Sequence, residues 1–120
     1  MITVELVLAI HQAILETEPG LKGTVDVSKL ESALSRIDNW MLYEKIDNIF
    51  DIAALYAVAI ARAHAFPDGN KRTAMVTMLI YLDLQGIEIK PNHGLDDTMV
   101  EVATGTMDFK QLAQHLQKLC

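Results

Sequence analysis

The chain has 120 residues, 51% of them hydrophobic, and a formal net charge of −6 at pH 7. This length suits one domain with a real hydrophobic core, and a division into two domains is implausible. The acidic charge excludes a general nucleic-acid binder, because such a protein needs a lysine- and arginine-rich surface to displace phosphate counterions. We therefore expect a single domain over residues 1–120, in which any phosphate site is local and no nucleic acid is bound directly.

The chain carries no sign of export or of membrane insertion. Its one cysteine, Cys120, cannot form an internal disulfide, so nothing calls for an oxidising compartment. Residues 1–5 lack the basic start of a signal peptide. The most apolar stretch, residues 52–61, is shorter than the roughly 18 to 20 residues that a membrane-spanning helix requires. We expect a cytoplasmic protein without a membrane partner.

The first part of the chain predicts two helices separated by a loop. Apolar residues recur at helical spacing from Thr3 to Leu15, and a Pro-Gly pair at 19–20 then stops the pattern. Residues 20–27 have no apolar period, which indicates a loop. A capping-box pattern at 28–31 predicts that the second helix begins at Ser28. Residues 39–45 carry no clear pattern, and their structure is left open.

The rest of the chain predicts four further helices. Residues 46–63 and 73–84 are apolar on nearly all sides, as helices are when neighbours surround them, and Gly86 suits a helix C-terminus. Residues 87–90 alternate like a strand but have no partner strand, so we expect an extended loop. Two shorter helices are predicted at 95–104 and 108–119, the latter capped by Asp108. The predicted fold is all-α, a compact bundle of about six helices.

The connection between the two central helices is unusually polar. Its five polar or ionisable residues are His64, Asp68, Asn70, Lys71 and Arg72. If a helix begins near Asn70 or Lys71, its unpaired backbone N–H groups and its dipole form an anion site. Gly69 permits close approach of the backbone, and the two cations suit phosphate oxygens. We expect the segment from His64 to Thr73 to bind the phosphates of a nucleotide.

Two side chains of this segment suit the transfer of a phosphoryl group. Asp68 is a hard oxygen ligand ahead of the anion site, where a Mg²⁺ ion that bridges nucleotide phosphates needs a carboxylate. His64 carries an imidazole, which can take the proton of an attacking hydroxyl as a general base. With Lys71 and Arg72 holding the charge of the transferred group, the set is complete.

Plainer interpretations of the same residues stay open. Asp, Gly and Asn at 68–70 favour turns and helix caps for local reasons, so spacing alone does not decide between a turn and a site. Lys71 and Arg72 could be solvated, although a positive charge at a helix N-terminus opposes the dipole by about 0.3 to 1 kcal/mol. The other histidines are His11, His93 and His115. They lie on different elements without metal-ligand spacing, so we assign them no zinc site.

The pattern His-x-Phe-x-Asp-Gly-Asn-Lys-Arg at residues 64–72 resembles the signature of the Fic/Doc family in its Doc-type toxin form, and the similarity spans nearly the whole chain. The resemblance implies use of ATP with Mg²⁺, with His64 as base and Asp68 as metal ligand. It also implies that Phe66 anchors the loop in the core. The residues that it implies around the phosphates are Gly69, Asn70, Lys71 and Arg72.

Within this family, one position bears on the reaction. The nucleotidyl-transferring members have glycine where this chain has Lys71, and a second arginine where Met75 stands here. Doc-type proteins with this lysine resemble protein kinases that phosphorylate a threonine of elongation factor Tu and so halt translation. The resemblance therefore implies an ATP-dependent kinase toxin whose catalytic residues are His64, Asp68, Lys71 and Arg72.

Partners and rival functions follow from the same resemblance. Family members of this kind are encoded with a small antitoxin that supplies an inhibitory helix, and this chain has no convincing Ser/Thr-x-x-x-Glu inhibitory motif of its own. A separate antitoxin is therefore implied. Two other functions stay open: transfer of AMP or another nucleoside monophosphate to a protein hydroxyl, and a non-catalytic module that only docks a partner.

Overall fold

Six α-helices make up the part of the chain that the computed structural model describes, residues 2–17, 23–89 and 94–119. They are α1 (Val4–Thr17), α2 (Val27–Glu44), α3 (Ile49–Ala63), α4 (Asn70–Leu84), α5 (Leu95–Thr104) and α6 (Phe109–Lys118). No strand occurs in these residues. The prediction of an all-α bundle of about six helices is confirmed.

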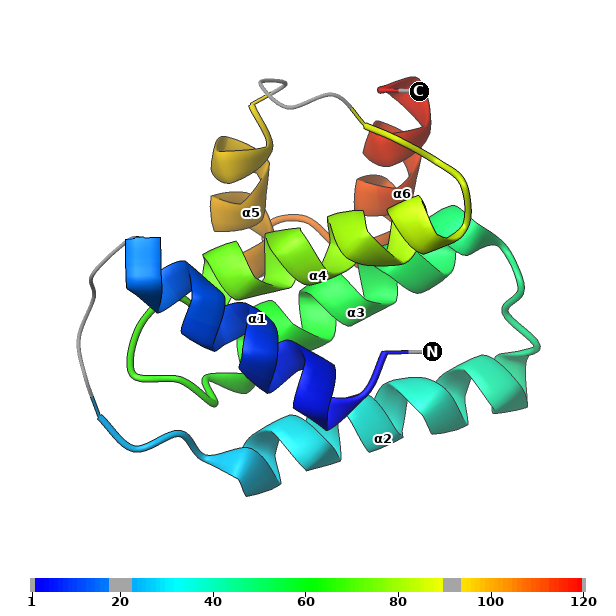
Figure 1. Cartoon of the computed structure of the whole chain (residues 1–120). Helices are drawn as coiled ribbons and strands as arrows, with labels where there is room; N and C mark the ends of the chain where they lie inside the picture. The colour runs from blue at the N-terminus through cyan, green and yellow to red at the C-terminus, as the bar shows by residue number, and fades with distance from the viewer. Residues whose placement is uncertain (1, 18–22, 90–93, 120) are drawn as a thin grey trace.

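The centre of the bundle is the pair α3 and α4, which lie side by side in Figure 1. α3 also contacts α2, α5 and α6, whereas α4 also contacts α1 and α5. Because α3 has neighbours on so many sides, five consecutive residues of it, 53–57, are buried. This arrangement explains why the sequence of α3 is apolar around its whole circumference.

α2 differs from its predicted start. Asp26 is the N-cap and accepts a hydrogen bond from the Lys29 N–H at 3.1 Å, so the capping box predicted at Ser28 is wrong. A carboxylate caps a helix as well as a hydroxyl does, and Asp26 comes first along the chain. Residues 39–44, left open above, continue the helix, which ends at Lys45 in the left-handed conformation.

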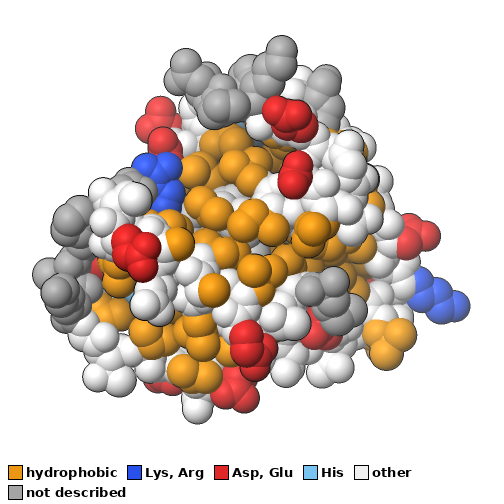
Figure 2. Space-filling view, in the orientation of Figure 1, with side chains coloured by type: hydrophobic (Ala, Val, Ile, Leu, Met, Phe, Trp, Pro, Cys, Tyr) orange, Lys and Arg blue, Asp and Glu red, His pale blue; other side chains and the backbone are white. Residues whose placement is uncertain are grey.

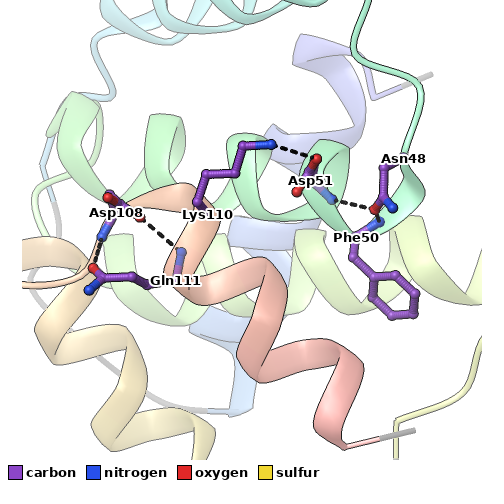
Figure 3. A network of polar contacts seen from close by, with 6 residues as sticks. All are labelled: Asn48, Phe50, Asp51, Asp108, Lys110 and Gln111. Carbon is purple, nitrogen blue, oxygen red and sulfur yellow. Dashed lines mark hydrogen bonds and ion pairs between the residues drawn. The ribbon is translucent and has the colours of Figure 1, made fainter.

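The start of α3 was predicted at about residue 46, and the structure corrects it to Ile49. The Asn48 Oδ1 accepts hydrogen bonds from the N–H groups of Phe50 at 2.9 Å and Asp51 at 3.2 Å (Figure 3). These amides have no acceptor within the helix, so the asparagine cap decides where the helix begins. An apolar pattern alone cannot show this, because apolar residues continue upstream of the cap.

The C-terminal helices follow the prediction closely. α5 spans the predicted residues 95–104, and Asp108 caps α6 as expected. The Asp108 carboxylate accepts from the Gln111 N–H at 2.8 Å, and the Gln111 side chain accepts from the Asp108 N–H at 3.0 Å (Figure 3). Lys110 Nζ lies 3.1 Å from the Asp51 carboxylate. This ion pair joins the start of α6 to the first turn of α3.

α4 begins at Asn70, as the anion-site argument requires, and ends at Leu84. Gly86 follows in the left-handed conformation at φ +82°, which suits the expected glycine at the helix end. Residues 87–89 form no strand, in line with the expected extended loop, and residue 90 lies outside the described residues. The Pro-Gly pair at 19–20 also lies outside them, although α1 ends at Thr17.

One face of the bundle carries apolar side chains at its centre and acidic side chains around them (Figure 2). Lysine and arginine side chains are sparse in this view. On this face the acidic side chains are therefore spread around the apolar centre rather than gathered at one point. Among the described helices, none combines the length and apolarity needed to span a membrane.

A buried tyrosine links the outer helix α2 to the central pair. Tyr56 on α3 is 1% exposed, and its hydroxyl donates a hydrogen bond to the Asp38 carboxylate at 3.4 Å. Its ring centroid lies 5.7 Å from that of Tyr81 on α4. Burial, with a contribution from the Asp38 charge, raises the pKa of Tyr56 from 10.0 to about 12. The neutral phenol is therefore the form that the folded protein favours.

This pKa difference makes a testable contribution to stability. A phenol with a raised pKa contributes fully below the unfolded value of 10.0, and the contribution is lost as the pH rises toward about 12. The free energy of unfolding should fall by about 1.4 kcal/mol per pH unit more in the natural chain than in Tyr56→Phe across that window. Denaturant titrations at stepped pH measure the difference. Parallel curves for the two proteins would contradict the assignment.

Candidate functional site

The connection between α3 and α4 turns the chain through two left-handed residues. His64 ends α3 with φ 52°, and Gly69 precedes α4 with φ +80°. Glycine adopts this conformation without strain, which explains its place just before the helix. The turn brings the N-terminus of α4 next to the end of α3. The helix whose N-terminus we expect to bind an anion is therefore present as α4, and it begins at Asn70.

Phe66 anchors this loop, and Asn70 holds its backbone. The Phe66 side chain is buried in the hydrophobic core, as expected from the family resemblance. The Phe66 N–H donates to the Asn70 Oδ1 at 3.2 Å, and the Asn70 Nδ2 donates to the Phe66 carbonyl oxygen at 2.9 Å. The asparagine thus satisfies both backbone polar groups of a buried residue, which would be costly to leave unpaired.

The segment before α2 supports the loop from a second direction. The Asp26 N–H donates to the Ala65 carbonyl oxygen at 2.7 Å. Gly23 lies so close to Pro67 that a Cβ on it would meet the proline ring at 2.9 Å. Any larger residue at 23 would therefore have to push this segment away from the loop. Residues 23–26 and 65–67 form one packed unit.

A cavity of about 370 Å³ opens beside the loop and the start of α4. Its lining residues are Ala61, His64, Pro67, Asp68, Gly69, Asn70, Lys71, Arg72 and Ala103. Ala103 belongs to α5, so this helix supplies one wall, whereas α3, the loop and α4 supply the others. The amides of the first turn of α4 have no acceptor within the helix, which makes this end of the cavity suited to an anion.

Six of the seven residues predicted to make the site line this cavity together. They are His64, Asp68, Gly69, Asn70, Lys71 and Arg72. Thr73, which was expected to contact a nucleotide, does not line this cavity. Its side chain is fully buried, and its Oγ1 has no hydrogen-bond partner among the described residues. Each helical residue rotates the side chain by about 100°, which turns Thr73 from the cavity into the core.

Asn70 takes a role that the motif alone does not show. Its side chain lines the cavity, but both of its polar atoms are bonded to Phe66. A contact between Asn70 and a phosphate would therefore use its backbone N–H rather than its amide group. The family resemblance implies that Asn70 is one of the residues around the phosphates, and the structure shows that its side chain holds the loop.

The two cations that line the cavity, Lys71 and Arg72, differ in their surroundings. The Arg72 Nη1 lies 3.5 Å from the Asp96 Oδ1 of α5. The Arg72 side chain is 38% exposed and that of Asp96 is 77% exposed. Exposed pairs of this kind contribute about 0 to 1 kcal/mol. Lys71 is exposed at the start of α4. Together the two cations oppose the helix dipole unless an anion lies between them and the helix end.

Asp68 is the one acidic residue among the described residues that line the cavity. Its Oδ1 accepts a hydrogen bond from the Gly69 N–H at 2.8 Å, which orients the carboxylate along the loop. No group of three or more candidate metal ligands occurs in the described part of the chain. A cation here would have Asp68 as its protein carboxylate and would need further oxygens from a ligand or water, as Mg²⁺ accepts with nucleotides.

Sequence reasoning missed the residues that support the loop from α1 and from residues 23–26. The sequence gives His11 no role, yet its side chain is buried and its Nε2 lies 2.9 Å from the Asp68 carbonyl oxygen. One signal was present: His11 stands four residues after Val7, on the same apolar stripe of α1. A histidine on such a stripe must find a polar partner, and that partner lies far away in the sequence.

Comparison with known proteins connects this site to a family. Residues 1–82, from before α1 to near the end of α4, match the model of the Fic/DOC family. The chain is 35% identical over 118 residues to "Protein kinase doc" of Escherichia phage P1. These residues cover 98% of this chain and 94% of that protein. It is 37% identical over 71 residues to "Toxin Doc" of Mycolicibacterium smegmatis, covering 57% of this chain and 55% of that protein.

The role of Asn70 gives a prediction about stability. Asn70→Ala should lower the free energy of unfolding by about 1 to 3 kcal/mol, because it leaves two backbone groups of Phe66 without partners. Lys71→Ala, at the neighbouring exposed position, serves as the matched control and should change stability by less than about 0.5 kcal/mol. Urea denaturation compares the two. Equal effects would show that the asparagine does not hold the loop.

Proposed function

The chain belongs to the Fic/DOC family, and from this premise we propose that it is the toxin of a toxin–antitoxin module, which transfers the γ-phosphate of ATP to a protein hydroxyl. The observation that carries the proposal is the cavity that His64, Asp68, Lys71 and the start of α4 line together. The two similar proteins described above, one named a protein kinase and the other a toxin, support it.

The start of α4 provides the proposed phosphate seat. The N–H groups of Asn70 and Lys71 lie in the first turn, where a helix offers donors and the positive end of its dipole. The Lys71 side chain adds a full positive charge beside them. A phosphate removes the repulsion between the dipole and the cations, so ligand binding and helix electrostatics favour each other.

His64 is the proposed general base. It is exposed at the end of α3 and lines the same cavity as the phosphate seat. The neutral imidazole takes the proton of the target hydroxyl while that oxygen forms a bond to the γ-phosphorus. The bond between the γ-phosphorus and the bridging oxygen breaks, and ADP leaves with that electron pair. Lys71 and Arg72 hold the charge that develops on the transferred group.

Asp68 is the proposed magnesium ligand, and a single carboxylate fits an ion that takes its other oxygens from phosphates and water. When bound, Mg²⁺ neutralises phosphate charge and orients the phosphate chain. The protein's part is to hold the carboxylate still. The Gly69 N–H donates a hydrogen bond to the Asp68 Oδ1, so the loop backbone sets the direction of the carboxylate.

Phosphate transfer is favoured over AMP transfer by the residues at 71 and 75. Lys71 is exposed at the cavity, so its charge is available to the end of a phosphate chain. Met75, where nucleotidyl-transferring relatives carry a second arginine, is buried on α4 and supplies no cation. The lysine and arginine side chains that line the cavity, Lys71 and Arg72, thus both lie in the first turn of α4.

We infer a threonine of elongation factor Tu as the target and a separate antitoxin as the inhibitor. Both inferences follow from the Doc-type resemblance of residues 64–72. Incubation with Mg²⁺, elongation factor Tu and ATP labelled at the α or γ phosphate tests the reaction. A phosphate-sized mass shift carrying the γ label is expected. An AMP-sized shift with the α label would replace the kinase by the rival transferase, and no shift would favour a binding module.

His64→Ala should lower the rate of transfer by about 10² to 10⁴-fold, the usual contribution of a general base. The fold should persist, because the side chain is exposed. His115→Ala on α6 is the control, since His115 does not line the cavity. Rates of label transfer and circular dichroism spectra measure both properties. Full activity of His64→Ala would exclude the base assignment.

Asp68→Asn keeps an oxygen that can accept from the Gly69 N–H but removes the charge. Binding of ATP in the presence of Mg²⁺ should weaken by roughly ten- to hundredfold, the contribution of an interaction with a charged group. Binding without metal should change little. Calorimetry with and without Mg²⁺ measures both affinities, and equal losses would refute the ligand role.

A further inference from the structure

A buried histidine on α1 lies against the loop between α3 and α4, next to Phe66, Asp68 and Gly69. His11 is 5% exposed, and its ring stacks on Phe66 with centroids 3.9 Å apart and planes inclined by 15°. Its Nε2 lies 2.9 Å from the Asp68 carbonyl oxygen. A Cβ placed on Gly69 would lie 3.6 Å from the His11 ring. The ring therefore lies against the loop from its core anchor to the residue before α4.

The hydrogen bond fixes where the proton of His11 resides. A carbonyl oxygen can only accept, so Nε2 must carry a proton and donate it to Asp68. An apolar residue at position 11 would stack on Phe66 and would continue the apolar stripe from Val7. Burying a polar ring instead is unfavourable unless it is hydrogen-bonded. The polar contact is thus the feature that distinguishes histidine from a simpler core residue here.

The bond acts on a rigid unit that also controls the Asp68 carboxylate. The Asp68 carbonyl and the Gly69 N–H belong to one planar peptide group, so neither can rotate without the other. His11 holds the carbonyl end, and the Asp68 Oδ1 accepts from the N–H end at 2.8 Å. Rotation of this peptide away from His11 would also turn the N–H away from the carboxylate.

We propose that His11 is a positioning residue of the site: by fixing the Asp68–Gly69 peptide, it aims the Asp68 carboxylate and the first amides of α4 at the cavity. The proposal rests on the proposed function for its effect on catalysis, but its effect on the loop stands on the contacts alone. The hydrogen bond joins the buried His11 ring to the backbone of a residue whose side chain lines the cavity, so it ties the loop to the core at the residue that carries the carboxylate.

Three variants separate positioning from packing. His11→Phe keeps an aromatic ring to stack on Phe66 but removes the donor. His11→Gln places an amide N–H where Nε2 stands and restores it. Val7→Ala, one turn earlier on the same buried face of α1, removes core volume without touching the Asp68 bond. The free energy of unfolding of each variant shows how much general destabilisation accompanies it.

Hydrogen exchange of the Gly69 amide is the readout that does not depend on catalysis. His11→Phe should speed this exchange about fivefold, the factor that corresponds to one net hydrogen bond. The Mg²⁺ concentration for half-maximal ATP binding should rise in parallel, and the turnover number should fall by about ten- to hundredfold, as misplaced groups cause. His11→Gln should recover most of all three quantities, and Val7→Ala should leave them within about twofold once stability is matched.

The outcomes are distinct for the two proposals. If His11→Phe behaves like Val7→Ala in exchange and in Mg²⁺ dependence, His11 is only a core residue and the inference fails. Failure of His11→Gln to recover them would also overturn it, because the donor would not be the cause. If the natural chain transfers no phosphate at all, the proposed kinase function fails, whereas exchange and metal-dependent nucleotide binding still decide the role of His11.

Discussion

The site depends on one constraint: a short loop joins two buried helices, and its backbone must be satisfied while its side chains face a cavity. The apolar ring of Phe66 packs in the core, and this burial removes the backbone N–H and carbonyl groups of Phe66 from water. Asn70 replaces that water with two hydrogen bonds. Asp26 and His11 bind the carbonyl groups of Ala65 and Asp68. Three different elements thus hold one loop, and the cavity takes its shape from it.

The sequence predicts the helices and the candidate site better than it predicts where each helix begins. Apolar periodicity predicts the helices because apolar residue types are the ones that a core buries. The polar residues between 64 and 72 indicate the candidate site because such residues are unusual in a connection between two core helices. The starts of α2 and α3 were misplaced because Asp26 and Asn48 compete with nearby candidates for the same orphan amides, which periodicity does not record.

The roles within the site were harder to predict for a different reason. Thr73 follows the cavity residues in the chain but is buried in the core, and Asn70 lines the cavity while its side chain is bonded to Phe66. His11 is distant in sequence from the residue it binds, so no local pattern marks it. Local chemistry thus identified which segment matters, whereas tertiary contacts decided what each side chain does.

Arg72 is paired with Asp96 in the structure, and the proposed phosphate would offer it a second partner. Its partner Asp96 is 77% exposed, and an ion pair in such water-rich surroundings contributes about 0 to 1 kcal/mol. Charge-assisted hydrogen bonds from an arginine to a phosphate contribute about 1.5 to 3 kcal/mol and are commonly bidentate. The proposed phosphate would therefore be the stronger partner of the two for Arg72. Asp96 lies in the first turn of α5 and Ala103 near the end of that helix lines the cavity, so this ion pair joins α4 to the helix that supplies one wall of the cavity.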